Sequence, residues 1–293
     1  MLFNKSGIGD KIMKNPRIGA HLPIGKGLQF TAGEAVSMGL EAVQMFIRNP
    51  RGRGARQYSE QELSAFKQIL QENDIGPVVV HIPYICNPAA ARDDLYEYAY
   101  EVVAEDLKRC RLINAGFLVL HPGSYTTSSL EQGIERIAAL LNRVLKQHEG
   151  ETCLLLETMA GQGTEIGKTF EELNLILQQV NNKDKIGICF DTCHTYAAGY
   201  NCTTDEGLNE VLTKMDKTFG RDLVKIVHAN DSSKELGSHR DRHAHIGQGF
   251  INLSGFEILM HNNFFRDLPF ILETPLEAMP EDIEALKNIR EQS

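Results

Sequence analysis

Short apolar runs recur at steady intervals along the chain. They cover residues 17–21, 42–47, 77–81, 117–121, 153–157, 186–191, 223–228 and 269–273. Each run is rich in β-branched or other apolar residues and is nearly unbroken by polar ones, a pattern typical of strands that are buried on both faces of a parallel sheet. The sequence therefore predicts eight parallel strands.

Helical patterns alternate with these strands. Pairs with the capping-box spacing that begins helices are Ser59 with Glu62, Ser128 with Glu131 and Thr169 with Glu172. The segment after Ser128 carries an apolar stripe at Leu130, Ile134, Ile137, Leu141 and Val144, which suits a helix that covers a sheet. Eight strand-helix units predict an α/β fold, a TIM (β/α)8 barrel. A doubly wound open sheet is the alternative, but the repeat continues without a linker or a change of composition, which favours a single domain.

The composition is that of an ordinary globular protein. Of 293 residues, 42% are hydrophobic and 24% are charged, and no apolar run approaches the roughly 18 residues of a membrane helix. The first residues contain no apolar stretch of signal-peptide length. Six cysteines form no CxxC pair, which fits reduced thiols. We expect a cytoplasmic protein that does not enter a membrane.

The net charge of −9 disfavours a polyanionic partner such as DNA, because phosphate binding is driven by positive charge. Divalent cations held by acidic side chains would reverse that sign locally. The charge of one cleft can therefore oppose the charge of the whole chain, and DNA is not excluded.

Metal-binding residue types end six successive predicted strands. These residues are His81, His121, Glu157, Asp191, His228 and Glu273. The carboxyl ends of barrel strands converge on one mouth, so these side chains would become neighbours. Polar residues also end strands simply because the chain returns to water. A series restricted to His, Asp and Glu nevertheless indicates zinc-type coordination, since Ser, Thr, Asn and Lys would end strands equally well.

Two short clusters add further candidate ligands. Asp191 is followed by His194, and in the loop HANDSSKELGSHRDRH, which begins at His228, Asp241 is followed by His243. Each spacing alone arises often by chance, but together they offer enough ligands for three ions.

Other motifs narrow the chemistry. The glycines of ETMAGQGTEIG do not match GxGxxG, so we expect no nucleotide cofactor, and no GxSxG nucleophile elbow is present. Metal-assisted hydrolysis or isomerisation remains. Residues 47–57 form a predicted loop with four arginines, which is either a solvated turn or an arm that contacts phosphate; they are Arg48, Arg51, Arg53 and Arg56.

Over nearly its whole length the chain resembles endonuclease IV, the three-zinc apurinic/apyrimidinic endonuclease family with a TIM-barrel fold. The resemblance rests on motifs in the same order and at comparable spacings: RIGAH, FIRNPR, VVVHIPY, LVLHPGS, LLLETMAGQGTEIG, CFDTCHTYAAGY, VHANDSSKELGSHRDRHAHIGQG and ILETP. Residues 1–15 extend beyond the usual start, so the barrel domain is expected at residues 16–293.

The resemblance implies a zinc-dependent deoxyribonuclease IV of base excision repair. It implies hydrolysis of duplex DNA on the 5′ side of an abasic site, leaving a 3′-hydroxyl and a 5′-deoxyribose phosphate. A monomer is expected. Manganese or iron could replace zinc at some sites, because nitrogen and oxygen ligands accept them.

The same resemblance implies the role of each site residue. One zinc would be held by His81, His121 and Glu157; a second by Glu157, Asp191, His228 and Glu273; the third by His194, Asp241 and His243. Glu157 and Glu273 would lie closest to the nucleophile, and Arg51 and Tyr84 would contact DNA. Ile85 and Cys86, which follow Tyr84, need not insert into DNA as the family's residues do, and His21, His239 and His245 are not implied as ligands.

Two other functions fit parts of the pattern. A sugar isomerase or epimerase also presents His, Asp and Glu at barrel strand ends, but it has no evident use for the third ligand set or the arginine loop. A catalytically inactive barrel that binds damaged DNA or a protein partner would more plausibly have lost Glu157 or Glu273.

Overall fold

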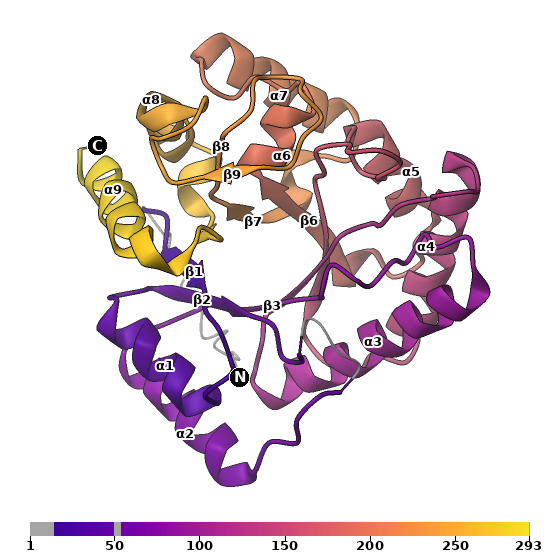
Figure 1. Cartoon of the computed structure of the whole chain (residues 1–293), viewed down its shortest axis with the longest axis horizontal. Helices are drawn as coiled ribbons and strands as arrows, with labels where there is room; N and C mark the ends of the chain where they lie inside the picture. Colours follow the sequence, from indigo (N-terminus) through magenta and orange to yellow (C-terminus); the bar gives the residue numbers. More distant parts are fainter. Residues whose placement is uncertain (1–14, 50–53, 293) are drawn as a thin grey trace, which may run out of the picture.

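In the computed structural model, which describes residues 15–49 and 54–292, eight parallel strands close into a barrel (Figure 1). The barrel strands are β1 (Ile18–His21), β2 (Ala42–Met45), β3 (Val78–His81), β4 (Phe117–Leu120), β5 (Cys153–Glu157), β6 (Ile186–Asp191), β7 (Val224–His228) and β10 (Phe270–Leu272). Closure comes from β1, which pairs with β2 on one side and with β10 on the other. The predicted barrel is confirmed.

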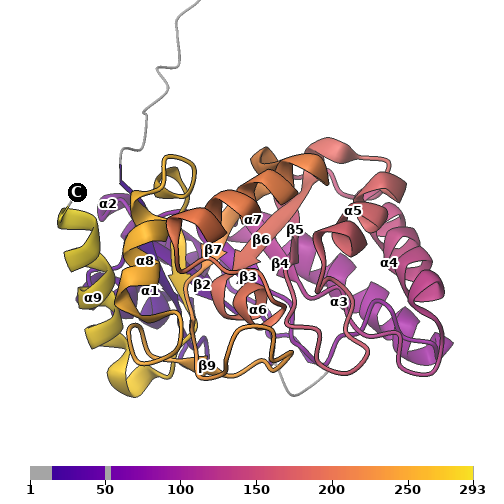
Figure 2. The ribbon, with the colours of Figure 1, turned by 90° about the horizontal axis from the view of Figure 1, so that it is seen from above.

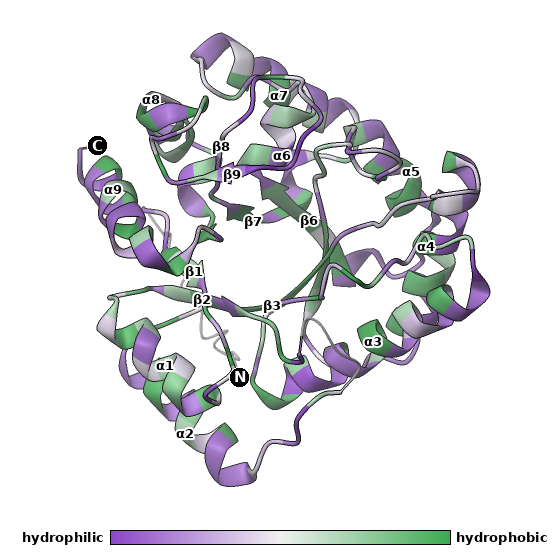
Figure 3. Ribbon diagram, viewed as in Figure 1, coloured by the Kyte–Doolittle hydropathy of each residue, from purple (hydrophilic) through white to green (hydrophobic). Residues whose placement is uncertain are grey.

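Helices surround the barrel on its outer side, except for the short helix that begins directly after β6 and lies at the barrel mouth (Figures 1 and 2). They are α1 (Leu28–Ser37), α2 (Glu60–Glu72), α3 (Asp93–Leu112), α4 (Leu130–Leu145), α5 (Phe170–Gln179), α6 (Thr192–Ala197), α7 (Asp205–Lys217), α8 (Asn252–His261) and α9 (Met279–Glu291). Short 3-10 helices lie at Lys183–Lys185, Arg221–Leu223, Phe265–Asp267 and Leu276–Ala278. In Figure 3 the strands are largely hydrophobic and the helices carry their polar residues on the outside. No helix among the described residues combines the length and apolar character that a bilayer span requires.

Strand alternation divides the apolar residues between two cores. Residues such as Val80 and Leu118 face outward and pack against the helices in the main core. The alternate residues fill the barrel interior: Val79, Val119, Leu155, Cys189 and Ile226, all fully buried. Each large apolar side chain buried in this way stabilises the fold by about 1.5 to 3 kcal/mol. The interior is thus a packed floor, and the next inward residues along the strands lie above it.

The helix starts agree closely with the sequence pattern. Ser59 and Thr169 accept hydrogen bonds from the backbone N–H groups three residues later, as predicted for N-caps. The prediction for α4 was wrong by one residue, because Ser129 caps the helix. The hydroxyl of Ser128 instead donates to the carbonyl of Tyr125 in the preceding turn.

A two-stranded antiparallel ribbon, which the sequence analysis did not predict, stands outside the barrel. It consists of β8 (Asp231–Ser232) and β9 (His243–Ala244). The ribbon folds the long loop after β7 back over the mouth, and Figure 2 shows β9 at one edge of the barrel. Two-residue strands in a polar loop carry no hydrophobic period from which they could be predicted.

Candidate metal centre

The carboxyl ends of the barrel strands bring polar side chains together above the apolar floor. The inward positions at this level are His21, Gln44, His81, His121, Glu157, Asp191, His228 and Glu273. The six predicted strand-end ligands are all among them. The remaining two, His21 and Gln44, come from β1 and β2.

Glu157 lies at the centre of this cluster and is fully buried. Its Oε2 is 3.1 Å from Nε2 of His81 and 3.2 Å from Nε2 of His121. Its Oε1 is 3.2 Å from Nδ1 of His228 and 3.2 Å from Nδ1 of His194. The two carboxylate oxygens therefore face different sets of imidazoles, the arrangement that a carboxylate shared between two ions requires.

Two groups of ligand atoms form around Glu157. His81, Glu157 and His228 offer atoms that all lie within 4.8 Å of one another, and so do Glu157, Asp191, His228 and Glu273. The second group is the ligand set expected for the second ion. In the first group His121 lies at 3.2 Å from the same Glu157 oxygen as His81, so the predicted first set also converges.

A third group lies beside the first two. Oδ1 of Asp241 is 3.3 Å from Nε2 of His194 and 3.3 Å from Nε2 of His243. Within the described part of the chain, both of these buried imidazole nitrogens lack a hydrogen-bond partner. A buried nitrogen without a partner costs about 1 to 3 kcal/mol, and a cation between these three side chains would remove that cost. The residues present therefore fit a metal ion.

Local structure explains the two short spacings. Asp191 ends β6 and is also the N-cap of α6, where its Oδ1 accepts a 2.7 Å hydrogen bond from the backbone N–H of His194. The interval from Asp191 to His194 is thus that from N-cap to third helical residue. His243 is positioned by the ribbon, in which it pairs with Ser232.

Hydrogen bonds orient individual imidazoles. Nδ1 of His81 is 2.7 Å from the carbonyl oxygen of Ile82, and Nδ1 of His194 is 3.0 Å from that of Thr158. A carbonyl can only accept, so each Nδ1 carries a proton and each Nε2 is the nitrogen available to a metal ion. These are the nitrogens that face Glu157 and Asp241.

The ionisable groups of the centre depend on one another. Burial opposes ionisation of Glu157, but His121 and His228 hold its pKa well below the usual value. Burial also opposes protonation of His194, yet Asp191 and Asp241 raise its pKa well above the usual value. For Asp191, burial outweighs its histidine neighbours and raises the pKa. The carboxylates thus need nearby positive charge, which divalent cations supply while displacing protons from the imidazoles.

Two residues that the sequence analysis missed hold the loops of this site. Nδ2 of Asn230 donates to Asp191 at 2.7 Å and to Glu273 at 3.2 Å. The buried Asp231 carboxylate accepts hydrogen bonds from five backbone N–H groups, those of Ser232, Gly247, Gly249, Ile251 and Asn252. Both follow His228 closely in sequence, which was the available signal. Their roles depend on long-range contacts that a single sequence does not reveal.

The arginine loop divides in the structure. Arg48 was grouped with solvated or phosphate-contacting arginines, and this was wrong: its side chain is 2% exposed and pairs with the fully buried Asp106. Burial of the guanidinium is possible because its Nε and Nη2 donate to that carboxylate. Arg56 is 60% exposed. Arg51 and Arg53 lie outside the described residues.

The residues after His81 also differ from one another in exposure. Tyr84 is 60% exposed and Ile85 is 45% exposed, so both are accessible at the barrel mouth. Cys86 is buried in the main core, where its thiol points at the carbonyl of Ala99. Tyr84 and Ile85 are therefore available to a partner, and Cys86 is not.

The three histidines that were not implied as ligands lie outside the three ligand groups. His21 is 3.9 Å from Oε1 of Glu273, and burial lowers its pKa to about 4. His245 pairs with the buried Asp282 at 2.7 Å. His239 is exposed, and its ring contacts the carbonyl oxygen of Ala160.

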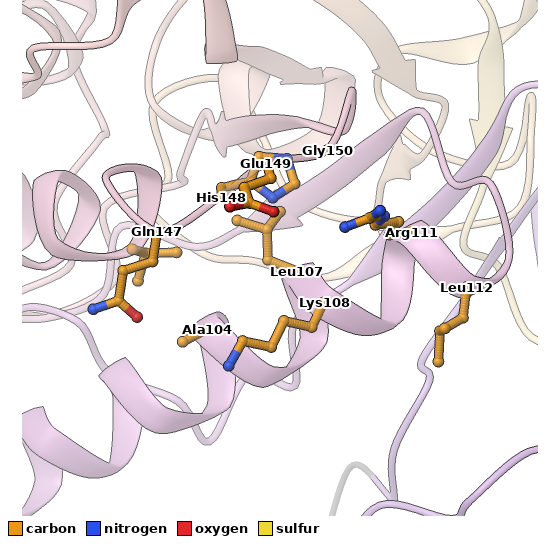
Figure 4. Close-up of a pocket in the computed structure, with 10 residues that line it drawn as sticks. Ala104, Leu107, Lys108, Arg111, Leu112, Gln147, His148, Glu149 and Gly150 are labelled. Atoms are coloured by element: carbon orange, nitrogen blue, oxygen red, sulfur yellow. The ribbon is translucent and has the colours of Figure 1, made fainter.

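Two hollows differ in their relation to this centre. A cavity of about 710 Å³ opens beside it, lined by His21, Phe46, Arg56 and Tyr58 among others. The Phe46 ring lies 5.8 Å from the ring of His81, so this cavity adjoins the ligands. A second cavity of about 500 Å³ lies between α3 and α4, with no candidate ligand in its wall (Figure 4).

The fold and the clustered His, Asp and Glu side chains define a TIM barrel with a candidate multinuclear metal centre. Residues 32–289 match the family model of the xylose isomerase-like TIM barrel. The chain is 40% identical over 275 residues to a probable endonuclease 4 of Halothermothrix orenii, a match that covers 94% of this chain and 99% of that protein. A crystal structure of endonuclease IV from Thermus thermophilus superimposes with a TM-score of 0.83 at 33% identity, covering 95% of this chain and 100% of that one.

The chain belongs to the endonuclease IV family, and it is a hydrolase of that nuclease class. A D-tagatose 3-epimerase-like protein also superimposes, with a TM-score of 0.70 over 94% of this chain and 97% of that one. Its sequence identity is 19%, so the likeness concerns the fold alone.

Proposed function

We propose that this chain is a DNA repair endonuclease that cleaves duplex DNA on the 5′ side of abasic sites and leaves a 3′-hydroxyl and a 5′-deoxyribose phosphate. The observation that carries the proposal is the third ligand group, His194, Asp241 and His243, beside the two groups that share Glu157. A sugar epimerase has no evident use for it, whereas phosphodiester cleavage must neutralise charge on several oxygens at once.

The proposed ligand sets follow the three groups. His81, His121 and Glu157 would hold one zinc, Glu157, Asp191, His228 and Glu273 a second, and His194, Asp241 and His243 a third. Bound zinc supplies Lewis acidity toward phosphoryl oxygens and lowers the pKa of water toward about 7.

The chain's own residues have distinct tasks in this reaction. Glu157 would keep two ligand groups at a fixed separation, because its two oxygens already face separate imidazoles. Glu273 lies beside His228, with its Oε2 3.3 Å from Nδ1, and would complete the second group at the edge of the cluster. We therefore assign the catalytic role to Glu157 and Glu273. The packed floor beneath them excludes water from below.

Recognition of DNA would use the rim of the barrel mouth. The exposed Tyr84 ring supports a role in contacting bases, since aromatic side chains stack on them. Arg51 is proposed as a phosphate contact from its place in the arginine loop. An abasic nucleotide costs least to extrude from the stack, so selection of the lesion needs no base to be read. We expect a monomer that works in the cytoplasm.

A metal count paired with a cleavage assay tests the proposal. Purified protein should contain three zincs per chain and should cut a duplex oligonucleotide with one abasic analogue once, on the 5′ side. A ketohexose should remain unchanged in the same preparation. Epimerised sugar with intact DNA would favour the isomerase alternative, and metal-replete protein that binds abasic duplex without cutting it would favour the inactive barrel.

A further inference from the structure

Gln44 is the one amide in the ring of inward side chains at the strand ends. It belongs to β2, where Val43 and Met45 face outward into the main core, and its side chain is fully buried. The run AVQMFI is otherwise apolar, so hydrophobic packing of this strand does not account for the polar side chain of Gln44. A buried amide of this kind persists only where hydrogen bonds satisfy it.

Both ends of the Gln44 amide have partners in the candidate metal centre. Nε2 donates a 2.7 Å hydrogen bond to Oε1 of Glu273 and lies 3.1 Å from Nδ1 of His21. Oε1 lies 2.9 Å from Nε2 of His228, which comes from β7. One side chain thus joins two of the proposed ligands.

The chemistry of these contacts determines where the protons lie. The Glu273 carboxylate can only accept, so the amide must turn its NH₂ toward it; the flipped amide would set two oxygens against each other at 2.7 Å. The amide oxygen then faces His228, and Nε2 of His228 must carry the proton. Nδ1 of His228 is then the ring nitrogen available to a cation, and it lies 3.2 Å from Oε1 of Glu157 and 3.3 Å from Oε2 of Glu273.

We propose that Gln44 is a positioning residue that selects the ligand atoms of the second ion. It holds His228 in the tautomer that binds through Nδ1, and it occupies Oε1 of Glu273 so that Oε2 faces the ion. Asn230 contacts the same Oε2 at 3.2 Å. This inference rests on the proposed ligand sets and concerns a residue that is no ligand itself.

Two substitutions separate the two contacts. Gln44→Met removes both hydrogen bonds at similar volume. Gln44→Glu keeps an acceptor for His228 but sets a carboxylate against Glu273. The matched control is Met45→Leu, a volume-conserving change at the neighbouring outward position. Zinc content is measured by mass spectrometry after dialysis, zinc affinity by competition with a chromophoric chelator, and the His228 tautomer by ¹⁵N NMR of the imidazole rings in zinc-loaded protein.

Gln44→Met should weaken binding of the second zinc by roughly 10- to 100-fold, the usual effect of losing a partner of a ligand. It should lower kcat more than it raises KM for abasic duplex, and it should allow both tautomers of His228. Gln44→Glu should lose zinc affinity while it keeps the Nε2–H tautomer, a difference that a purely structural role would not produce. Met45→Leu should match the wild type.

Unchanged zinc affinity in folded Gln44→Met, or Nδ1–H at His228 in the wild type, would overturn the inference. If Gln44→Met fails to fold, the wild-type tautomer and the Gln44→Glu affinity still decide the question. Wild-type protein that binds zinc but leaves abasic DNA intact would overturn the proposed function and leave this inference standing.

Discussion

Two buried clusters of charged side chains lie in this molecule, and they are built differently. Between the loop after β2 and helix α3, Arg48 donates from Nε to both oxygens of Asp106, at 2.9 and 2.8 Å, and Glu105 bridges Arg48 and Arg109. Here two arginines balance two carboxylates. At the strand ends and in the loop after β7, the carboxylates of Glu157, Asp191, Asp241 and Glu273 face histidines instead, and two of the imidazole nitrogens have no hydrogen-bond partner in the described part of the chain.

The difference indicates which cluster needs an external cation. Arginine is always charged, and its planar guanidinium donates parallel hydrogen bonds to a carboxylate. The charges and hydrogen bonds of the arginine cluster are therefore satisfied without an external ion. Imidazole nitrogens that face carboxylate oxygens repel them unless a proton or a metal ion lies between the two. The arginine cluster is therefore complete within the fold, and the histidine cluster is the one that we propose to bind metal for the reaction.

Substitution of Glu157 is the strongest test of the difference between the two clusters. Glu157→Gln should lower cleavage of abasic duplex by at least about 10³-fold, the upper range for loss of one preorganised electrostatic group, because a neutral amide cannot be shared between two cations. Folding should remain largely intact, since the shape is conserved. The measurement is kcat together with the zinc count. Glu105→Gln in the arginine cluster is the matched control and should retain wild-type turnover; undiminished turnover in Glu157→Gln would sink the mechanism.

Removal of Asp106 tests the other cluster. Asp106→Ala leaves the Arg48 guanidinium buried beside the half-exposed Glu105 alone, and breaking a buried pair in this way costs about 3 to 5 kcal/mol. Urea unfolding should record that loss, while zinc content per folded chain stays unchanged. Loss of zinc without loss of stability would reverse the roles assigned to the two clusters.

The two clusters also differ in how well the sequence predicts them. The convergence of the six strand-end residues could be predicted because a parallel barrel brings regularly spaced strand ends into one ring, and each of these residues lies directly after an apolar run. The burial of Arg48 could not, because its partner Asp106 is 58 residues away on a helix whose docking the pattern does not specify. Gln44 was missed for a related reason: its contact with His228 spans 184 residues and crosses the barrel.

Removal of metal should lower the stability that depends on the histidine cluster and leave the contribution of the arginine cluster unchanged. A ligand that binds only the folded state stabilises it by about 2.7 kcal/mol at 100 times its Kd. Dialysis against a chelator should therefore lower the thermal midpoint of the wild type, and zinc should restore it. Asp106→Ala should lose and regain a similar increment, since the clusters share no partner. A melting temperature indifferent to the chelator would contradict a metal at the strand ends.

The smallest expected effect distinguishes two arginines of one loop. Arg56 is 60% exposed and pairs with Glu62 at 2.7 Å, so Arg56→Ala should change stability by no more than about 1 kcal/mol, as for other surface ion pairs. If the exposed part of the loop contacts phosphate, the same change should reduce the slope of log binding affinity against log salt by about one. The measurement is binding of uncleaved abasic duplex to the chelated protein over a salt series. Because Arg48 is buried against Asp106, Arg48→Lys should lower the free energy of unfolding and leave the salt slope unchanged. A reduced salt slope in Arg48→Lys with an unchanged slope in Arg56→Ala would mean that the buried arginine, rather than the exposed one, contacts the DNA.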